Sequence, residues 1–266
     1  MVWIGVAVTL ALLGGVVWIA VVTGDKGSGD APAAPTWQGP APSEIALVVR
    51  RLVTERLAQA AGELAAVEEL AQHHAFDMAV RNYSHEVDPE GVDLATRRAR
   101  LARGFVGELT EWDHVVVPHG AKTAESLAEE LLTGAGANGT ELTALLASPR
   151  WNAVGVGVAA ESKRCSLCLV FADHWATIEG GKIVEPPDAG WQVSGQLGGG
   201  VDAAEVEGVL LDDGGAEISR SQPTLVDPDG ARPRAFTLVL AHPGDPRNLF
   251  LTMRRDGREG YWGPVD

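Results

Sequence analysis

The sequence predicts an α+β protein in which one membrane-spanning helix precedes a helix-wrapped antiparallel sheet, and a small all-β sandwich ends the chain. Three observations lead to this fold class. An apolar segment opens the chain, apolar residues then recur at helical spacing as far as residue 147, and short β-like segments separated by Gly- and Asp-rich turns follow. The 266 residues leave room for two folded domains at about 150 residues each.

The first element is an apolar segment over residues 2–22, which contains no ionisable side chain. As a helix it would be roughly 31 Å long, close to the hydrocarbon thickness of a bilayer. A cleavable signal peptide normally has a basic start and a shorter apolar stretch, so we expect residues 1–23 to be a retained single-pass anchor. A cleaved signal, which would give a secreted protein, and a buried core helix are the alternatives.

A tether and a helix-rich domain follow the anchor. Residues 24–42 mix Gly, Pro and polar residues without periodicity, which predicts a tether. From Ser43 onward, apolar spacing predicts two amphipathic helices separated by Gly62, and further helices over residues 124–132 and 141–147. Strands are expected at residues 153–160 and 168–173, with a hairpin turn between them. We therefore place one α+β domain at residues 43–174.

The last third of the chain has a different pattern. After a linker at residues 175–185, four β-like segments alternate with the turn sequences GGG, DDGG, DPDG and HPGDP. This spacing predicts a small β-sandwich over residues 186–266.

Charge and cysteine content narrow the function classes. Acidic residues outnumber basic ones 36 to 21 and give a net charge of -15, which excludes a protein that coats nucleic-acid phosphates. Cys165 and Cys168 are the only cysteines, too few for a four-thiolate zinc site. Residues three apart on a strand point to opposite faces, which opposes a disulfide between the two cysteines. Export from the cytoplasm would favour one, so the sequence does not decide between a disulfide and two free thiols.

Several motifs in the central region occur in a recognisable order. They are LAQHHAFDMAVRNYSHEVDPEG at residues 70–91, Gly-Glu at residues 107–108, LLASPRWNAVGVGVA at residues 145–159 and the strand CLVFAD. Over about residues 43–173 the chain resembles the CAP superfamily (cysteine-rich secretory, antigen 5 and pathogenesis-related 1 proteins) in its bacterial SCP-like form. The resemblance implies an α-β-α sandwich with a short antiparallel sheet, located outside the cytoplasm.

The resemblance also points to a site. It implies that His85 and Glu108 face a common cleft, where they are candidate ligands for a divalent metal ion such as zinc or candidate catalytic groups. The alternative is a hydrogen bond that holds the loop after the second helix on the sheet. The chain departs from the family at Leu109, where an asparagine is usual. It also lacks a histidine between residues 120 and 173, so His114 or His119 would have to complete a metal shell.

Other polar residues have ordinary structural explanations. His74 lies on the apolar face of its helix, which predicts a packed, hydrogen-bonded histidine. His73 and Asp77 are four apart and predict a surface pair, with metal ligation as the alternative. The DPEG and DPDG sequences (residues 88–91 and 227–230) are typical of turns rather than calcium loops.

Together these features predict a membrane-tethered, extracytoplasmic binding or cell-envelope interaction module that does not turn over a substrate. Its partners would be the membrane, through residues 2–22, and an unidentified envelope protein, glycan or lipid, but not nucleic acid. One alternative is a metal-assisted hydrolase that uses His85 and Glu108. The other is capture of a lipid or sterol-like ligand, which requires an apolar groove between helices.

Overall fold

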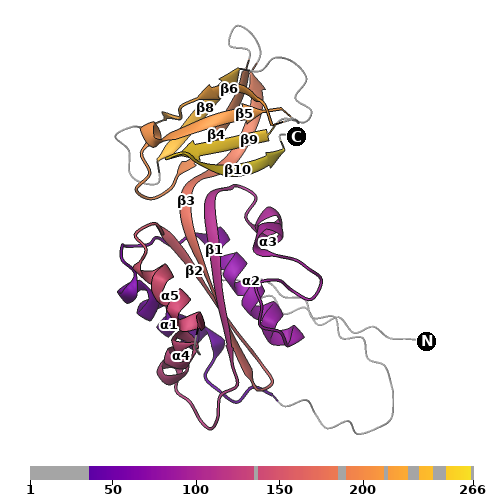
Figure 1. The fold of residues 1–266 in the computed structure, drawn as a ribbon, viewed down its shortest axis with the longest axis vertical. Coiled ribbons are helices and arrows are strands. Elements are labelled where there is room, and N and C mark those ends of the chain that lie inside the picture. The colour runs from indigo at the N-terminus through magenta and orange to yellow at the C-terminus, as the bar shows by residue number, and fades with distance from the viewer. Residues whose placement is uncertain are drawn as a thin grey trace, which may run out of the picture. The chain divides into compact units, whose positions relative to one another are not determined.

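The computed structural model of the protein describes residues 36–134, 137–184, 190–212, 215–226, 234–241 and 250–264. Within these ranges the chain forms five α-helices and ten strands, arranged in two antiparallel sheets (Figure 1). The helices are α1 (Pro42–Arg56), α2 (Ala65–Arg81), α3 (Leu94–Leu101), α4 (Ala124–Thr133) and α5 (Ala137–Ala147).

Six strands form the first sheet, in the order β1-β3-β4-β8-β7 with β2 also paired to β3, and four form the second, in the order β10-β9-β5-β6. The strands of the first sheet are β1 (Phe105–Val116), β2 (Ala153–Glu161), β3 (Arg164–Val184), β4 (Gly190–Leu197), β7 (Thr224–Leu225) and β8 (Ala235–Ala241). Those of the second are β5 (Val206–Leu211), β6 (Glu217–Ser221), β9 (Phe250–Arg255) and β10 (Arg258–Pro264).

The strand β3 overturns the predicted fold class. Its first half pairs with β1 and β2, and its second half pairs with β4, so one sheet extends through the residues predicted to be a linker. The strand continues because Trp175, Ala176 and Ile178 are buried in a second core. A CAP-type α-β-α sandwich that follows a transmembrane helix and precedes a separate β-sandwich is therefore the wrong description of this chain.

The predicted membrane anchor lies outside the described residues. None of the helices within the described ranges is long and apolar enough to cross a bilayer. The prediction of a span at residues 2–22 thus stays a prediction, as does most of the predicted tether, of which the structure describes only residues 36–42.

Two helical layers cover the two faces of the β1-β3-β2 region (Figure 1). Side chains of α1, α4 and α5 share a core with Val154, Val156 and Val158 of β2. On the opposite face, Gly155 and Gly157 allow α2 to approach β2 so closely that an added Cβ would lie 2.3 Å and 2.1 Å from α2 carbonyl oxygens. The alternation of valine and glycine in β2 therefore determines which helix packs on each face.

The two cysteines follow the same alternation. Cys165 belongs to the core shared with α1, and Cys168 belongs to the core shared with α2, so their side chains lie on opposite faces of β3. Both are buried and free. Burial raises the pKa of the Cys165 thiol to about 12 and raises that of Cys168 as well, which leaves both thiols protonated and unreactive at neutral pH.

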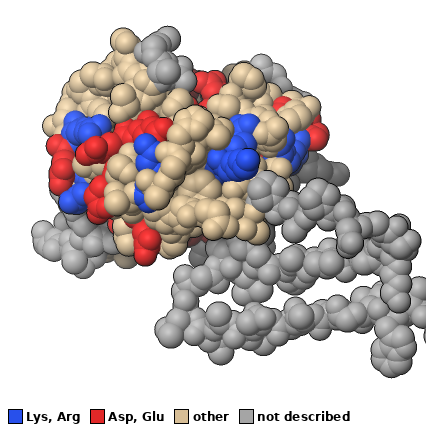
Figure 2. Space-filling view, turned by 90° about the horizontal axis from the view of Figure 1, so that it is seen from below, with Lys and Arg blue, Asp and Glu red and all other residues tan. Residues whose placement is uncertain are grey.

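Acidic and basic side chains are interspersed over the face of the molecule shown in Figure 2. Ion pairs among the described residues connect basic side chains with nearby carboxylates, such as Arg81 with Asp77 and Lys122 with Glu130. On this face, charge is therefore balanced locally rather than separated into regions of one sign.

Candidate metal centre

The histidine of the candidate site projects from α2 onto the sheet. His74 is 1% exposed and lies among the buried residues of that helix, which confirms the prediction of a packed, hydrogen-bonded histidine. The close approach of α2 to Gly155 and Gly157 holds the helix on this face. The position of the imidazole is therefore determined by packing.

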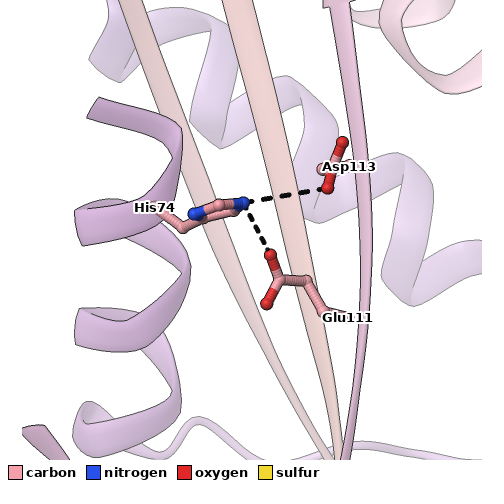
Figure 3. Close-up of side chains that lie close together, drawn as sticks. All are labelled: His74, Glu111 and Asp113. Carbon is pink, nitrogen blue, oxygen red and sulfur yellow. Dashed lines mark ion pairs between the residues drawn. The ribbon is translucent and has the colours of Figure 1, made fainter. Parts of the chain in front are cut away.

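Two carboxylates of β1 face this imidazole (Figure 3). Successive side chains of a strand alternate between its faces, so Glu111 and Asp113 point the same way while Trp112 joins the opposite core. The Nε2 atom of His74 lies 2.9 Å from Glu111 Oε1 and 3.8 Å from Asp113 Oδ2. The two carboxylate side chains are only 3% and 8% exposed.

A fourth group reaches the same nitrogen from the loop after α2. The carbonyl oxygen of His85 lies 3.1 Å from His74 Nε2 and accepts a hydrogen bond from it. Two oxygen atoms from β1 and one from the loop after α2 thus lie around one imidazole nitrogen.

The permanent cation of the cluster is Arg97 on α3. Asp93 caps this helix by accepting a hydrogen bond from the Thr96 amide. The Arg97 guanidinium bonds to Glu111 and donates to the carbonyl oxygens of Val92 and Glu86 at 3.0 Å and 3.1 Å. One arginine therefore faces two buried carboxylates, which leaves one negative charge to be balanced by His74 or by another cation.

Two carboxylate oxygens at the centre of the cluster accept no hydrogen bond. They are Glu111 Oε1 and Asp113 Oδ2, both buried. Glu111 Oε1 still lies within ion-pair distance of the imidazole, but the Nε2 hydrogen is directed at the His85 carbonyl. Buried carboxylates are costly without a nearby positive charge, so these oxygens require a cation between them.

The titration of His74 reflects this requirement. Burial by itself lowers the pKa of the imidazole, but the neighbouring carboxylates of Asp113 and Glu111 outweigh burial and raise the pKa to about 9. Without another cation, the imidazole is protonated at neutral pH and supplies the missing charge itself.

The opposite edge of the imidazole is held by polar neighbours. Its Nδ1 atom lies 3.4 Å from the Tyr83 hydroxyl, which donates to Asp77 at 2.5 Å. Burial and the Asp77 carboxylate raise the pKa of Tyr83, so the phenol stays neutral. A pocket of about 440 Å³ opens beside this edge, lined by His73, His74, Asp77, Arg81, Asp88, Glu90, Val92, Arg97, Arg100 and Leu101.

The structure places the two predicted site residues in different groups. The side chain of His85 is exposed, and its backbone carbonyl rather than its imidazole reaches the cluster. Glu108 lies on β1 and pairs with Arg150 and with Arg258, whose Nη1 atom is 3.8 Å from Glu108 Oε1. Among the described residues, the side chains of His85 and Glu108 therefore do not form the predicted pair at a common cleft.

The other histidines considered from the sequence lie elsewhere. His114 was expected in a loop but is part of β1, and strand alternation directs it away from the face that carries Asp113. Burial lowers the pKa of His114. His119 is exposed in the loop after β1, as expected. His73 is exposed, while Asp77 bonds Tyr83 and Arg81 instead.

One of the two turn predictions can be compared with the structure. The DPEG sequence is a turn, in which Asp88 Oδ1 accepts from the amides of Glu90 and Val92 and Gly91 has a φ of +85°. The DPDG sequence at residues 227–230 lies outside the described residues.

Sequence reasoning missed Glu111, Asp113 and Arg97. The available signal was the spacing of Glu111, Trp112 and Asp113, which puts both carboxylates on one face of any strand that contains them. No strand was expected there, so these residues were not considered beside His74.

Comparison with known proteins adds no relative. No protein-family model matches the chain, and no curated protein matches it. The resemblance to the CAP superfamily therefore rests on the sequence motifs alone.

Proposed function

We propose that the protein is a divalent-cation-binding protein in which the ion is held by His74, Glu111 and Asp113. The observation that carries this proposal is the convergence of one imidazole nitrogen and two buried carboxylate oxygens without hydrogen bonds. The three ligand atoms lie within 4.8 Å of one another. Nitrogen and oxygen ligands of this kind suit zinc and related divalent ions.

The distances in the cluster fit an ion without large movements. Ligands about 2.1 Å from a tetrahedral ion are about 3.4 Å apart. The separations from His74 Nε2 are 2.9 Å to Glu111, 3.1 Å to the His85 carbonyl and 3.8 Å to Asp113, and they bracket that value. The ion would replace the Nε2 proton and would occupy the space that the unbonded carboxylate oxygens face.

Such a centre favours a structural role over turnover. All four candidate ligands come from the protein, whereas a catalytic metal keeps one position open for water or substrate. The ion would join α2, β1 and the loop that follows α2. We therefore propose a binding or cell-envelope interaction module, held at a membrane by the predicted anchor, in which the metal organises the loop around His85.

Protons compete with the metal ion for His74, so the affinity for the ion should depend on pH. Metal must displace the proton from an imidazole whose pKa is raised to about 9. At pH 7 this competition lowers the affinity for zinc about 100-fold relative to a deprotonated site. Affinity should therefore rise about tenfold per pH unit between pH 7 and pH 9, with release of about one proton per ion.

Isothermal titration calorimetry of the full-length protein with zinc, in a mild detergent, tests this function. Asp113→Asn keeps the shape of the side chain but removes a ligand charge, and we expect at least tenfold weaker zinc binding. His73→Gln changes an exposed histidine on the same helix and serves as the matched control, with unchanged binding expected. Equal zinc binding by wild type and Asp113→Asn, or no saturable binding, would contradict the proposal.

A metal-assisted hydrolase is the second candidate, and the pocket of about 440 Å³ beside His74 favours it. In that case a water molecule facing the pocket would replace one of the protein ligands. Hydrolysis of an ester, peptide or polysaccharide substrate by the zinc-loaded protein, abolished in Asp113→Asn, would support this candidate. Bound zinc without such activity would support the structural role. Capture of a lipid or sterol-like ligand stays a prediction from the sequence.

A further inference from the structure

A second charged cluster surrounds Asp173 on β3. Its carboxylate side chain is 3% exposed and lies close to three guanidinium groups. Arg258 Nη1 is 2.6 Å from Asp173 Oδ2, Arg255 Nη1 is 3.5 Å from Oδ1, and Arg150 Nε is 3.7 Å from Oδ2. One buried carboxylate thus faces three permanent cations.

The other acidic partners of these arginines are more exposed. Glu108 pairs with Arg150 and Arg258, Glu205 pairs with Arg255 at 2.9 Å, and Asp256, whose side chain is 71% exposed, lies 4.0 Å from Arg255. The side chains of Glu108 and Glu205 are 30% and 47% exposed. Ion pairs this accessible to water are weak, so an anionic ligand can compete with them for the guanidinium groups.

Two of the arginines are held in place by buried aromatic rings. The guanidinium of Arg150 lies 4.8 Å from the ring centre of Trp151, and that of Arg258 lies 5.4 Å from the ring centre of Trp175. Both tryptophans are buried. Cation–π contacts of this kind orient the guanidinium planes before any ligand arrives, which reduces the entropy lost on binding.

The three arginines and Asp173 line a pocket of about 320 Å³ together with uncharged polar groups. Gln59 and Asn152 belong to its wall, as does the backbone at Gly199 and Gly200. Asn152 is fixed because its side chain accepts from the His174 amide at 2.7 Å and donates to the His174 carbonyl at 2.8 Å. The volume falls within the range of small-molecule sites and exceeds that of a single small ion.

From this arrangement we infer that the pocket around Arg150, Arg255 and Arg258 binds an oxyanion with two negative charges. A phosphate group or a pair of carboxylates presents the oxygen atoms that guanidinium groups bind in a bidentate manner. The excess of cations in the pocket wall is local, because the whole chain has a net charge of -15. Attraction would therefore come from these three residues and not from the overall charge.

Calorimetric titration of the full-length protein with inorganic phosphate and, separately, with malonate tests this inference. Metal is first removed with EDTA, and the chelator is then removed by dialysis so that its carboxylates do not compete for the pocket. Titration with sodium chloride at matched ionic strength controls for screening. We expect saturable binding of at least one of the two oxyanions, and preference for one of them identifies phosphate or dicarboxylate as the ligand chemistry. Heat indistinguishable from the chloride titration would overturn the inference.

Substitutions of single arginines test whether the oxyanion binds in this pocket. Arg150→Gln should weaken oxyanion binding at least tenfold, whereas Arg220→Gln, which changes an exposed arginine paired with Glu217, should leave it unchanged. Arg150→Lys keeps the charge but loses the bidentate geometry, and an intermediate loss is expected even if the glutamine variant folds poorly. Equal loss in the Arg220 control would contradict the site. Unchanged oxyanion binding in Asp113→Asn would separate this result from that of the metal centre.

Discussion

Two buried charge clusters on the first sheet differ in their balance of carboxylates and cations. Near α2, Glu111 and Asp113 face one permanent cation, Arg97. Around Asp173, three arginines approach a single buried carboxylate. Among buried groups, the first cluster has more carboxylates than permanent cations, whereas in the second the cations outnumber the one buried carboxylate and also pair with the more exposed Glu108, Glu205 and Asp256. We therefore expect the local balance of charged side chains, rather than the net charge of the chain, to determine which ligand each cluster attracts.

Removing the single arginine of the cation-poor cluster should have the largest effect on stability. In Arg97→Gln, Glu111 loses its charged partner, and the carbonyl oxygens of Val92 and Glu86 lose a donor. Breaking a buried ion pair from one side costs about 3–5 kcal/mol, and we expect a decrease of that size in the free energy of unfolding. Urea denaturation at pH 7 measures it. A decrease below about 1 kcal/mol would mean that Glu111 is protonated or solvated instead.

The pH dependence of stability should show the protonated His74. Its pKa is raised from 6.5 to about 9 in the folded protein, so the folded state holds a proton that the unfolded state releases. In EDTA, this histidine should therefore stabilise the protein fully below pH 6.5. It should lose about 3 kcal/mol as the pH rises through 9.

Urea denaturation at pH 6.5 and pH 9, compared between wild type and His74→Gln, isolates this contribution. We expect a clear alkaline loss in wild type and little in the variant. Addition of zinc should reduce the alkaline loss, because the bound ion keeps the imidazole deprotonated at both pH values. Parallel pH profiles for the two proteins in EDTA would contradict the assignment.

His174, which lies beside Asp173, should titrate with the opposite sign. Burial lowers the pKa of its imidazole to about 4 in the folded protein, although the backbone at Ala176 and the Asp173 charge act in the other direction. The unfolded state therefore takes up the proton first, and stability should fall by about 2 kcal/mol from pH 6.5 to pH 5. Urea denaturation of His174→Gln should show a smaller loss of stability between pH 6.5 and pH 5 than wild type. An equal loss in the two proteins would contradict the assignment of this pH dependence to His174.

Removing one arginine from the cation-rich cluster should have the smallest effect. Arg258→Gln removes the 2.6 Å hydrogen bond to Asp173, but Arg255 and Arg150 remain near the carboxylate. We expect a loss of about 1–2 kcal/mol in urea denaturation, near the contribution of one hydrogen bond to a charged group. A loss as large as that of Arg97→Gln would show that the two clusters do not differ in the way proposed.

Local periodicity allowed part of the fold to be predicted. The apolar spacing of Ile45, Val48, Val49 and Leu52 predicted α1, and the valine-glycine alternation predicted β2. The strand β1 was missed because Glu111 and Asp113 interrupt its apolar alternation on the face that holds the site, and Glu108 interrupts it on the other face. The length of β3 was missed because its continuation beyond His174 depends on packing against the second sheet, which no local pattern specifies.

The candidate sites were only partly predicted for the same reason, because local patterns do not specify which elements meet. The burial of His74 followed from its place on α2, but its partners come from another element, and pairing across elements requires the three-dimensional arrangement. The family resemblance directed attention to His85 and Glu108. Of these, His85 reaches the metal cluster only through its carbonyl, and Glu108 belongs to the arginine cluster.

The most direct test of the metal centre is an anomalous difference map at the zinc absorption edge, from crystals of the full-length protein grown with zinc at pH 8. Our account predicts one strong peak about 2.1 Å from His74 Nε2, Glu111 Oε1 and Asp113 Oδ2, with the His85 carbonyl as a neighbour. The absence of a peak at this position, with the imidazole still bonded directly to the His85 carbonyl, would contradict it.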